Sequence, residues 1–346
     1  MEPLIEEPSN MFDRIVNFFV VNQDPRTINW FLSGSPVPLA TILVSYLYFC
    51  LYAGPKYMKN RKPFELKNVL IVYNAIQVVF SCILVHEGLE GGWREHYNFT
   101  CELVDYSDNP LAMRMLGAVW FYYMCKLIEL LDTVFFVLRK KQNQVTFLHV
   151  YHHTMMPFAG FIGTKYVGGG HTTLLGLINS FIHVIMYSYY MLAAMGPHMQ
   201  KYLWWKRYLT VMQMIQFGIV FIHTIQVQFY PSCKYPKGIA ALLSLNAALF
   251  FYMFASFYYH AYVKPKKAKT ELNGHVTHEM NGKISANGHA NGHANGYANG
   301  HANGTVMSNG CSNGYANGHA NGHAGHQTHQ NGITNGNVAN GKTKVH

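Results

Sequence analysis

Charged residues and cysteines are scarce in this chain of 346 residues. Only 12% of the residues are charged and six are cysteine, whereas 50% are hydrophobic. No two cysteines form a Cys-x-x-Cys pair, which argues against a zinc ribbon and against a thioredoxin-like motif. The segment before residue 36 lacks a basic start followed by a compact apolar core, so we expect no cleavable signal peptide.

Acidic residues are also few. The chain has 16 Asp and Glu against 26 Lys and Arg, and its formal net charge is +10. Such an excess can indicate nucleic-acid binding, but here the basic residues cluster beside apolar segments and form no soluble basic face. We therefore predict no nucleic-acid partner and interpret the charge as a sign of membrane topology.

Apolar residues are nearly missing from the C-terminal part. Residues 270–346 repeat Asn-Gly-His-Ala and its variants, a composition that cannot bury enough apolar surface to offset the entropy of ordering, so we expect disorder there. A histidine-rich tract can bind metal. Because these histidines are separated by Asn, Gly and Ala, we interpret them as a repeat expansion and predict no metal site.

Residues 37–263, by contrast, are mostly apolar. A helix needs roughly 20 apolar residues to cross a bilayer. The sequence predicts an all-α, polytopic membrane domain over 37–263, preceded by a lumenal segment, 1–36, and followed by a basic juxtamembrane segment and cytosolic tail, 264–346. The seven predicted transmembrane helices are 37–54, 68–85, 116–138, 147–166, 172–195, 208–230 and 239–263.

The distribution of Lys and Arg between the connections predicts the orientation. Basic residues concentrate in alternate connections, which the positive-inside rule places in the cytosol with the C-terminus, leaving the N-terminus outside it. These connections are 55–67, 139–146, 196–207 and 264–269.

Three further features agree with this orientation. Asn98-Phe-Thr is a glycosylation sequon on the predicted lumenal side, where Cys101 can also reach Cys233 in an oxidising compartment. An unused sequon and two free thiols are the alternatives. Lys342 and Lys344 resemble a dilysine-type retrieval signal, which predicts residence in the endoplasmic reticulum membrane.

Three histidines enter the fourth predicted span within five residues. At about 100° per helical residue, His149, His152 and His153 fall on one arc, so three imidazoles face one place. Imidazole can ligate metal, move protons or attack a carbonyl. The alternative is a polar helix start whose histidines cap carbonyls or contact headgroups.

Other polar groups also lie inside the predicted spans, where ionisable residues usually indicate function. The alternatives are a structural ion pair for the third span and polar contacts between helices for the fifth and sixth. The residues are Lys126, Glu129 and Asp132 in the third span, Asn179, His183 and Tyr187 in the fifth, and Gln213 and Gln216 in the sixth.

These groups are expected at a common depth in the cytosolic half of the membrane, because neighbouring spans run antiparallel. Polar groups beneath basic connections, with apolar helices beyond, suit a reactive head on an anionic carrier with a long tail, as in a long-chain acyl-CoA. We therefore predict a membrane enzyme acting on a lipid thioester. The basic residues expected to bind the carrier are Arg139, Lys140, Lys206, Arg207, Lys264 and Lys266.

Four motifs in this order resemble the very-long-chain fatty-acid elongases, the ELO condensing enzymes, over roughly residues 20–268. They are Lys126-x-x-Glu129-x-x-Asp132-Thr133, Gln144 with His149-x-x-His152-His153, Asn179-x-x-x-His183-x-x-Met186-Tyr187-x-Tyr189-Tyr190, and Thr210-x-x-Gln213-x-x-Gln216.

The resemblance implies a fold and an activity. It implies seven spans, of which six form an inverted-repeat barrel around an acyl tunnel closed toward the lumen. It also implies condensation of acyl-CoA with malonyl-CoA to a 3-ketoacyl-CoA, CO2 and CoA, without a bound cofactor. His152 and His183 are then expected at the reacting carbonyl, and Cys101 and Cys233 in a lumenal bridge. The reductase, dehydratase and enoyl reductase of the elongation cycle would be partners, in membrane lipid.

The side chains suit this reaction. The one cysteine near the motifs, Cys125, turns away from their helical face, so an imidazole must act directly. We expect His152 to attack the thioester and form an acyl-imidazole, with His183 and Asn179 orienting malonyl-CoA and Glu129 or Asp132 fixing a tautomer. The alternative role of His152 is that of a general base.

Two other classes of protein share parts of the pattern. A membrane di-iron desaturase or hydroxylase also carries a His-x-x-His-His box, but it needs several histidine clusters, whereas residues 37–263 contain one cluster and scattered histidines. A seven-helix receptor or transporter is the alternative that is no enzyme.

Overall fold

The computed structural model describes residues 10, 11 and 20–264. The predicted binding residue Lys266, the Asn-Gly-His-Ala repeat and the C-terminal lysines lie outside the described residues. Residues 20–264 are helical with connecting turns and contain no β-strand. The main helices are α2 (Pro36–Tyr48), α3 (Gly54–Met58), α4 (Lys67–Gly88), α5 (Pro110–Ile128), α6 (Leu131–Leu138), α7 (Phe147–Tyr166), α8 (Thr173–Met195), α9 (Lys206–Phe229) and α10 (Lys237–Tyr258).

Local sequence signals explain where several helices begin. The side chains of Ser35 and Asn109 accept backbone N–H bonds at the starts of α2 and α5, and each is followed by a proline, which suits the first turn. Thr146 caps α7 by accepting a hydrogen bond from the backbone N–H of His149. This cap places the three neighbouring histidines in the first two turns of α7.

Five of the seven predicted spans are confirmed as helical segments long and apolar enough to cross a bilayer. In the described part of the chain these are Pro36–Met58, Lys67–Trp93, Thr173–Met195, Lys206–Phe229 and Lys237–Val263. The other two predicted spans are helical but do not meet both conditions. The span 116–138 is divided at Glu129–Leu130 into α5 and α6, and α7 carries three histidines and Lys165.

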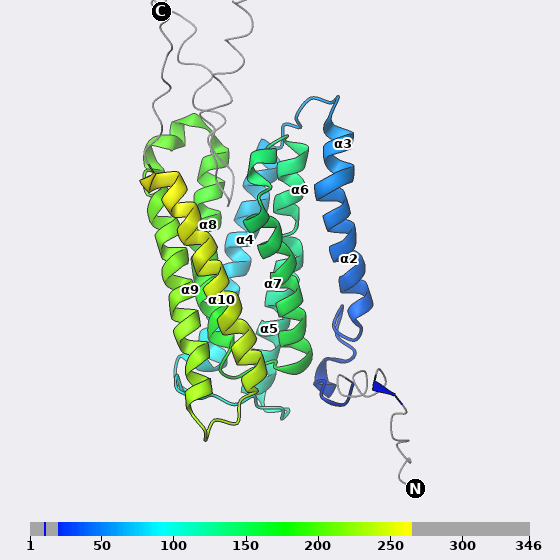
Figure 1. Cartoon of the computed structure of the whole chain (residues 1–346), viewed down its shortest axis with the longest axis vertical. Helices are drawn as coiled ribbons and strands as arrows, with labels where there is room; N and C mark the ends of the chain where they lie inside the picture. The colour runs from blue at the N-terminus through cyan, green and yellow to red at the C-terminus, as the bar shows by residue number, and fades with distance from the viewer. Residues whose placement is uncertain (1–9, 12–19, 265–346) are drawn as a thin grey trace, which may run out of the picture.

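The long helices are arranged around a common interior (Figure 1). Helix α4 packs along α8, α9 packs along α10, and α5 packs against α7, while α4 also contacts α5 and α8 contacts α9. The neighbour order is therefore α7, α5, α4, α8, α9, α10. A hydrogen bond from the Tyr151 hydroxyl to Asn246 Oδ1, 3.0 Å long, joins the two ends of this series. Helices α2 and α3 lie outside it, beside α6 (Figure 1).

The two ends of the helix bundle differ in character. The α3–α4, α6–α7 and α8–α9 connections lie together at one end (Figure 1); with the helix ends beside them they carry 11 of the 19 Lys and Arg residues in 20–264. At the opposite end a disulfide bond joins Cys101 to Cys233, with a Cα–Cα distance of 5.8 Å. The first described helix turn, Pro25–Thr27, lies at this second end (Figure 1).

A pair of histidines also closes the second end. The rings of His171 and His223 stack with centroids 3.8 Å apart, and each Nε2 lies within 3.0 Å of the other residue's backbone carbonyl oxygen. Because a carbonyl only accepts, each Nε2 carries a hydrogen. Burial lowers the pKa of His171 below its usual value, and the two reciprocal contacts hold the α7–α8 connection against α9.

Candidate active site

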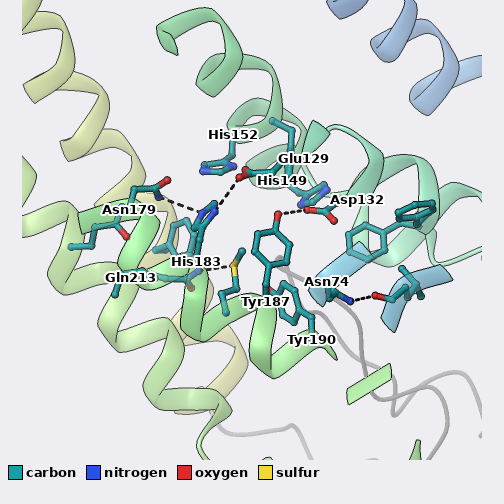
Figure 2. A pocket seen from close by; sticks show the side chains of 18 of the residues that line it. Asn74, Glu129, Asp132, His149, His152, Asn179, His183, Tyr187, Tyr190 and Gln213 are labelled. Atoms are coloured by element: carbon teal, nitrogen blue, oxygen red, sulfur yellow. Dashed lines mark hydrogen bonds and ion pairs between the residues drawn. The ribbon is translucent and has the colours of Figure 1, made fainter. Parts of the chain in front are cut away.

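A cavity of about 40 Å³ lies in the half of the bundle nearer the basic end. It is bounded by α4, α6, α7, α8, α9, α10 and the turn between α5 and α6. Every predicted polar residue of the interior except Lys126 lines it: Glu129, Asp132, His149, His152, His153, Asn179, His183, Tyr187, Gln213 and Gln216. Figure 2 shows how these side chains converge from several helices.

Lys126 reaches this cavity through an ion pair with Glu129. Its Nζ lies 2.7 Å from Glu129 Oε1 and 3.0 Å from Oε2, and the residues are only 2% and 3% exposed. The ammonium also lies over the Tyr122 ring, 4.7 Å from its centroid. Lys126 lies in the last turn of α5, and Glu129 lies in the turn between α5 and α6, three residues later. The two side chains therefore pair within one buried part of the chain.

His183 is held by partners on both ring nitrogens. Its Nδ1 lies 3.1 Å from Glu129 Oε1 and 3.2 Å from Lys126 Nζ, and its Nε2 lies 3.4 Å from Asn179 Nδ2. The Tyr122 hydroxyl donates to Asn179 Oδ1 at 2.9 Å, which leaves the Asn179 amide N–H groups for the ring. The contacts with Glu129 and Asn179 are both hydrogen bonds when Nδ1 carries the hydrogen and donates to Glu129 while Nε2 accepts from Asn179; the Lys126 ammonium then donates to Glu129 and only lies near Nδ1.

The three histidines of α7 have different surroundings. His149 Nε2 lies 2.8 Å from the Thr133 hydroxyl, which in turn lies 2.8 Å from the Tyr46 hydroxyl. The His153 ring lies between its neighbours, 4.2 Å from the His149 centroid and 5.2 Å from that of His152. Figure 2 shows His152 and His183 projecting toward the same space from α7 and α8.

Neither His152 nor His153 has a hydrogen-bond partner in the described part of the chain, but His153 is buried between the other two rings, whereas His152 is the more exposed of the two. Within the described part of the chain its ring makes aromatic contacts, with His153 and with Phe250, and it lines the cavity. Its nitrogen lone pair is therefore available to a ligand, whereas a hydroxyl contacts one nitrogen of His149 and His183 has a partner on each nitrogen.

Asp132 lies beside the His149 ring and farther from His183 than His152 does (Figure 2). The Tyr187 hydroxyl donates to its Oδ2 at 2.9 Å. The Gln213 side-chain amide donates a weak hydrogen bond, 3.6 Å long, to the Met186 sulfur. Its carbonyl oxygen takes no part in that bond. These residues add further hydrogen-bonding groups to the lining of the cavity.

The predicted carrier-binding residues that the structure describes lie outside the cavity, at the basic end of the bundle. None of them is among the residues that line it. Arg139 and Lys140 follow α6, Lys206 and Arg207 begin α9, and Lys264 follows α10 and its last turn. They surround the end at which the cavity lies.

Several cavity and network residues were not predicted from the sequence. Tyr122 lies one helical turn before Lys126, so its position on the same face was a usable signal. Asn74 lines the cavity and is a polar residue inside an apolar span, the same signal that identified the other groups. Phe217 and Phe254 carry no such signal, because aromatic residues are common throughout the spans.

The remaining predicted sites lie elsewhere. Asn98 is exposed on the connection after α4, at the same end as the Cys101–Cys233 disulfide. Cys125 is buried in an apolar cluster with Tyr122 and Met156. Within the described residues, no three His, Cys, Asp or Glu side chains are grouped to hold a metal ion.

A larger cavity of about 400 Å³ lies farther from the basic end. Its walls come from α4, α5, α7, α8 and α10 and are almost wholly apolar. The structure thus combines a small polar cavity with a longer apolar space, which suits a ligand with a reactive head and a hydrocarbon tail.

Comparisons with known proteins agree with this geometry. Residues 31–270 match the ELO family, described as GNS1/SUR4. The chain is 50% identical to very long chain fatty acid elongase 7 of Drosophila melanogaster over 266 residues, which cover 76% of this chain and 80% of the relative. It is 46% identical to elongase 7 of Rattus norvegicus, covering 77% and 96%, and 44% identical to elongase 1 of Homo sapiens, covering 80% and 100%. The protein therefore belongs to the family of very-long-chain fatty-acid elongases.

Proposed function

We propose that this elongase carries the growing acyl group on His152 while it performs the condensing step of fatty-acid elongation. The enzyme is a 3-ketoacyl-CoA synthase, which joins an acyl-CoA and malonyl-CoA. The observation that carries the proposal is the His152 imidazole, which faces a polar cavity and has no described hydrogen-bond partner, next to the fully partnered His183.

In the first step, a nitrogen lone pair of His152 attacks the thioester carbonyl of the acyl-CoA. The C–S bond breaks and the CoA thiolate leaves, and the acyl-imidazole remains in its protonated form because the ring keeps its other N–H; the ring returns to neutral imidazole when the acyl group is transferred. No cysteine is available for this step in the cavity, since none of its lining residues is cysteine. The apolar walls beyond the histidines would exclude water from the reactive acyl-imidazole.

In the second step, malonyl-CoA loses CO2, and the electrons of the broken C–C bond form an enolate. Its carbon attacks the acyl carbonyl, the C–N bond to His152 breaks, and the 3-ketoacyl-CoA forms. Asn179 lines the cavity and would stabilise enolate charge with the amide N–H that the His183 ring does not use, whereas Lys126 would act through its contacts with Glu129 and His183. Glu129 holds the His183 ring in the tautomer that accepts from Asn179.

The decisive experiment omits malonyl-CoA. With acyl-CoA alone, the enzyme should release up to one equivalent of CoA, and its intact mass should rise by one acyl group. His152→Ala should abolish both signals, whereas His183→Ala should still acylate slowly but fail to condense. If rapid quenching shows no CoA release until malonyl-CoA is added, His152 acts as a base and a ternary-complex mechanism replaces this one.

The substrate would bind along the axis of the bundle. The CoA phosphates would contact Arg139, Lys140, Lys206, Arg207, Lys264 and Lys266, and the tail would occupy the apolar cavity. We propose seven transmembrane spans. Five are the helical segments that are long and apolar enough to cross a bilayer, and the other two are α5 with α6, and α7. The neighbour order α7, α5, α4, α8, α9, α10 supports an inverted pair of three-helix units.

The cellular setting follows from the same features. Basic connections at one end and a disulfide at the other support an endoplasmic-reticulum location with the N-terminus lumenal and the C-terminus cytosolic. Because a 3-ketoacyl-CoA still carries its ketone, the enzymes that consume it would be the reductase, dehydratase and enoyl reductase of the same cycle.

A further inference from the structure

A short region, which we call the neck, separates the polar cavity from the apolar cavity. A third cavity, of about 20 Å³, lies between them. It shares His152, Asn179, Gln216 and Phe217 with the polar cavity and Met156, Leu175, Leu243 and Asn246 with the apolar cavity. The three cavities therefore form one series in which the middle one has the smallest volume.

This series runs along the bundle axis from the basic end to the disulfide end. Leu70, in the first turn of α4, lines the polar cavity, whereas Gly88, the last residue of α4, lines the apolar cavity. Helix α8 runs the other way, and its later residue Tyr190 lines the polar cavity while its first residue, Thr173, lines the apolar one. An acyl chain with its carbonyl at His152 and its tail in the apolar cavity must thread the neck with its first few carbons.

Two phenylalanine rings make the rigid side of the neck. Phe217 of α9 and Phe250 of α10 stack with centroids 5.2 Å apart and planes inclined by 21°. Phe250 also contacts the His152 ring at 5.4 Å, and Phe254 packs against Phe217 at 5.1 Å. Phe250 is 1% exposed and Phe217 is 9% exposed, so neither ring can move aside without displacing packed neighbours.

A small residue, Ala247, lines the neck beside the two rings. Ala247 lies three residues before Phe250 on α10, is 3% exposed, and lines the neck. Met156 of α7 and Leu175 of α8 line the neck as well. The neck thus combines two fixed rings with one methyl group.

We propose that the stacked pair Phe217 and Phe250 selects acyl chains by the shape of their first few carbons. A straight, saturated segment passes between the side formed by the two rings and Ala247 and the side formed by Met156 and Leu175, whereas a cis double bond or a methyl branch near the carboxyl end is excluded. Discrimination by an apolar pocket against a misfitting group is about tenfold or more. The inference rests on the proposed function, because it takes the reacting carbonyl to lie at His152.

The test compares two monounsaturated acyl-CoAs of equal length. One has its cis double bond within the first few carbons, and the other has it near the middle of the chain. The measured quantity is the ratio of kcat/KM for the mid-chain isomer to kcat/KM for the carboxyl-proximal isomer. We expect a ratio of about 10 or more for the wild-type enzyme.

The variants widen or narrow the neck. Phe217→Leu removes part of a ring without touching the His152 contact and should lower the ratio severalfold, while Ala247→Val should raise it. Phe250→Leu should lower it too, together with the absolute rates, because it loses the ring contact with His152. Phe251→Leu is the matched control, since Phe251 is 42% exposed on the same helix and lines none of the three cavities, and should leave the ratio unchanged.

A wild-type ratio near one, or a ratio that Phe217→Leu and Phe250→Leu both leave unchanged, would overturn the inference. In that case the enzyme would still condense both isomers, so the proposed function would stand. If neither of the two isomers is condensed with malonyl-CoA, the result would instead contradict the proposed function itself.

Discussion

Glu129 offers the sharpest test of whether the buried charges serve catalysis or only the fold. Its Oε1 lies 2.7 Å from the Lys126 ammonium and 3.1 Å from His183 Nδ1. Glu129→Gln keeps the size of the side chain but removes the negative charge. The change leaves the Lys126 ammonium buried without its counter-ion and weakens the contact that fixes the His183 tautomer.

Both effects have expected magnitudes. Removing one partner of a buried ion pair costs about 3–5 kcal/mol, which lowers the midpoint of thermal unfolding on the order of 10 °C for a domain of this size. Loss of a correctly held acid or base costs about 10²–10⁴-fold in rate. The assays are thermal unfolding in detergent and the rate of condensation measured well below the unfolding midpoint.

A double variant separates the two roles. Lys126→Met with Glu129→Leu removes both charges together, and replacing a buried ion pair by apolar residues is often neutral for stability. We expect the unfolding midpoint to return near the wild-type value while the rate stays at least about 100-fold low. A double variant that recovers the wild-type rate would refute our reasoning and show that the pair is purely structural.

Three further predictions concern the two ends of the bundle. Cys101→Ser should remove the bridge to Cys233, which spans 132 residues of sequence, and lower stability by about 2–4 kcal/mol with little effect on the rate below the unfolding midpoint; equal midpoints in reduced and oxidised wild-type protein would contradict this. Asn98 should carry a glycan in cells, seen as a mass shift on glycosidase treatment. If the loop that contains Asn98 is instead accessible only from the cytosolic side of the membrane, the proposed topology is reversed. Lys206→Gln with Arg207→Gln should raise the KM for acyl-CoA about tenfold at low salt and less at high salt; unchanged KM values at low salt would place the CoA phosphates elsewhere.

The helices and the chemistry of the interior were readable from local patterns. Long apolar runs predict spans, and five of the seven predicted spans are confirmed as apolar helices of sufficient length. Ionisable residues stand out inside such runs because burying them is costly. Helical periodicity then placed His149, His152 and His153 on one arc, and all three line one cavity.

The partners of those residues depended on packing between helices that are distant in sequence. Tyr122 contacts Asn179 across 57 residues, and the ring of Phe250 contacts His152 although almost 100 residues separate them. The interruption of the helix at Glu129, where the ion pair meets His183, could not be predicted either, because the sequence has no proline or glycine there.

Which residues are polar, where they lie along each helix and which face they share can be read from the amino-acid sequence, because these follow from the period of one helix. Helix packing, in contrast, determines that a hydroxyl contacts His149 while His152 faces the cavity without one. It also decided that two phenylalanines narrow the path beyond them. Aromatic residues line the spans on every side, and only the meeting of α9 with α10 determines which of their rings face the interior.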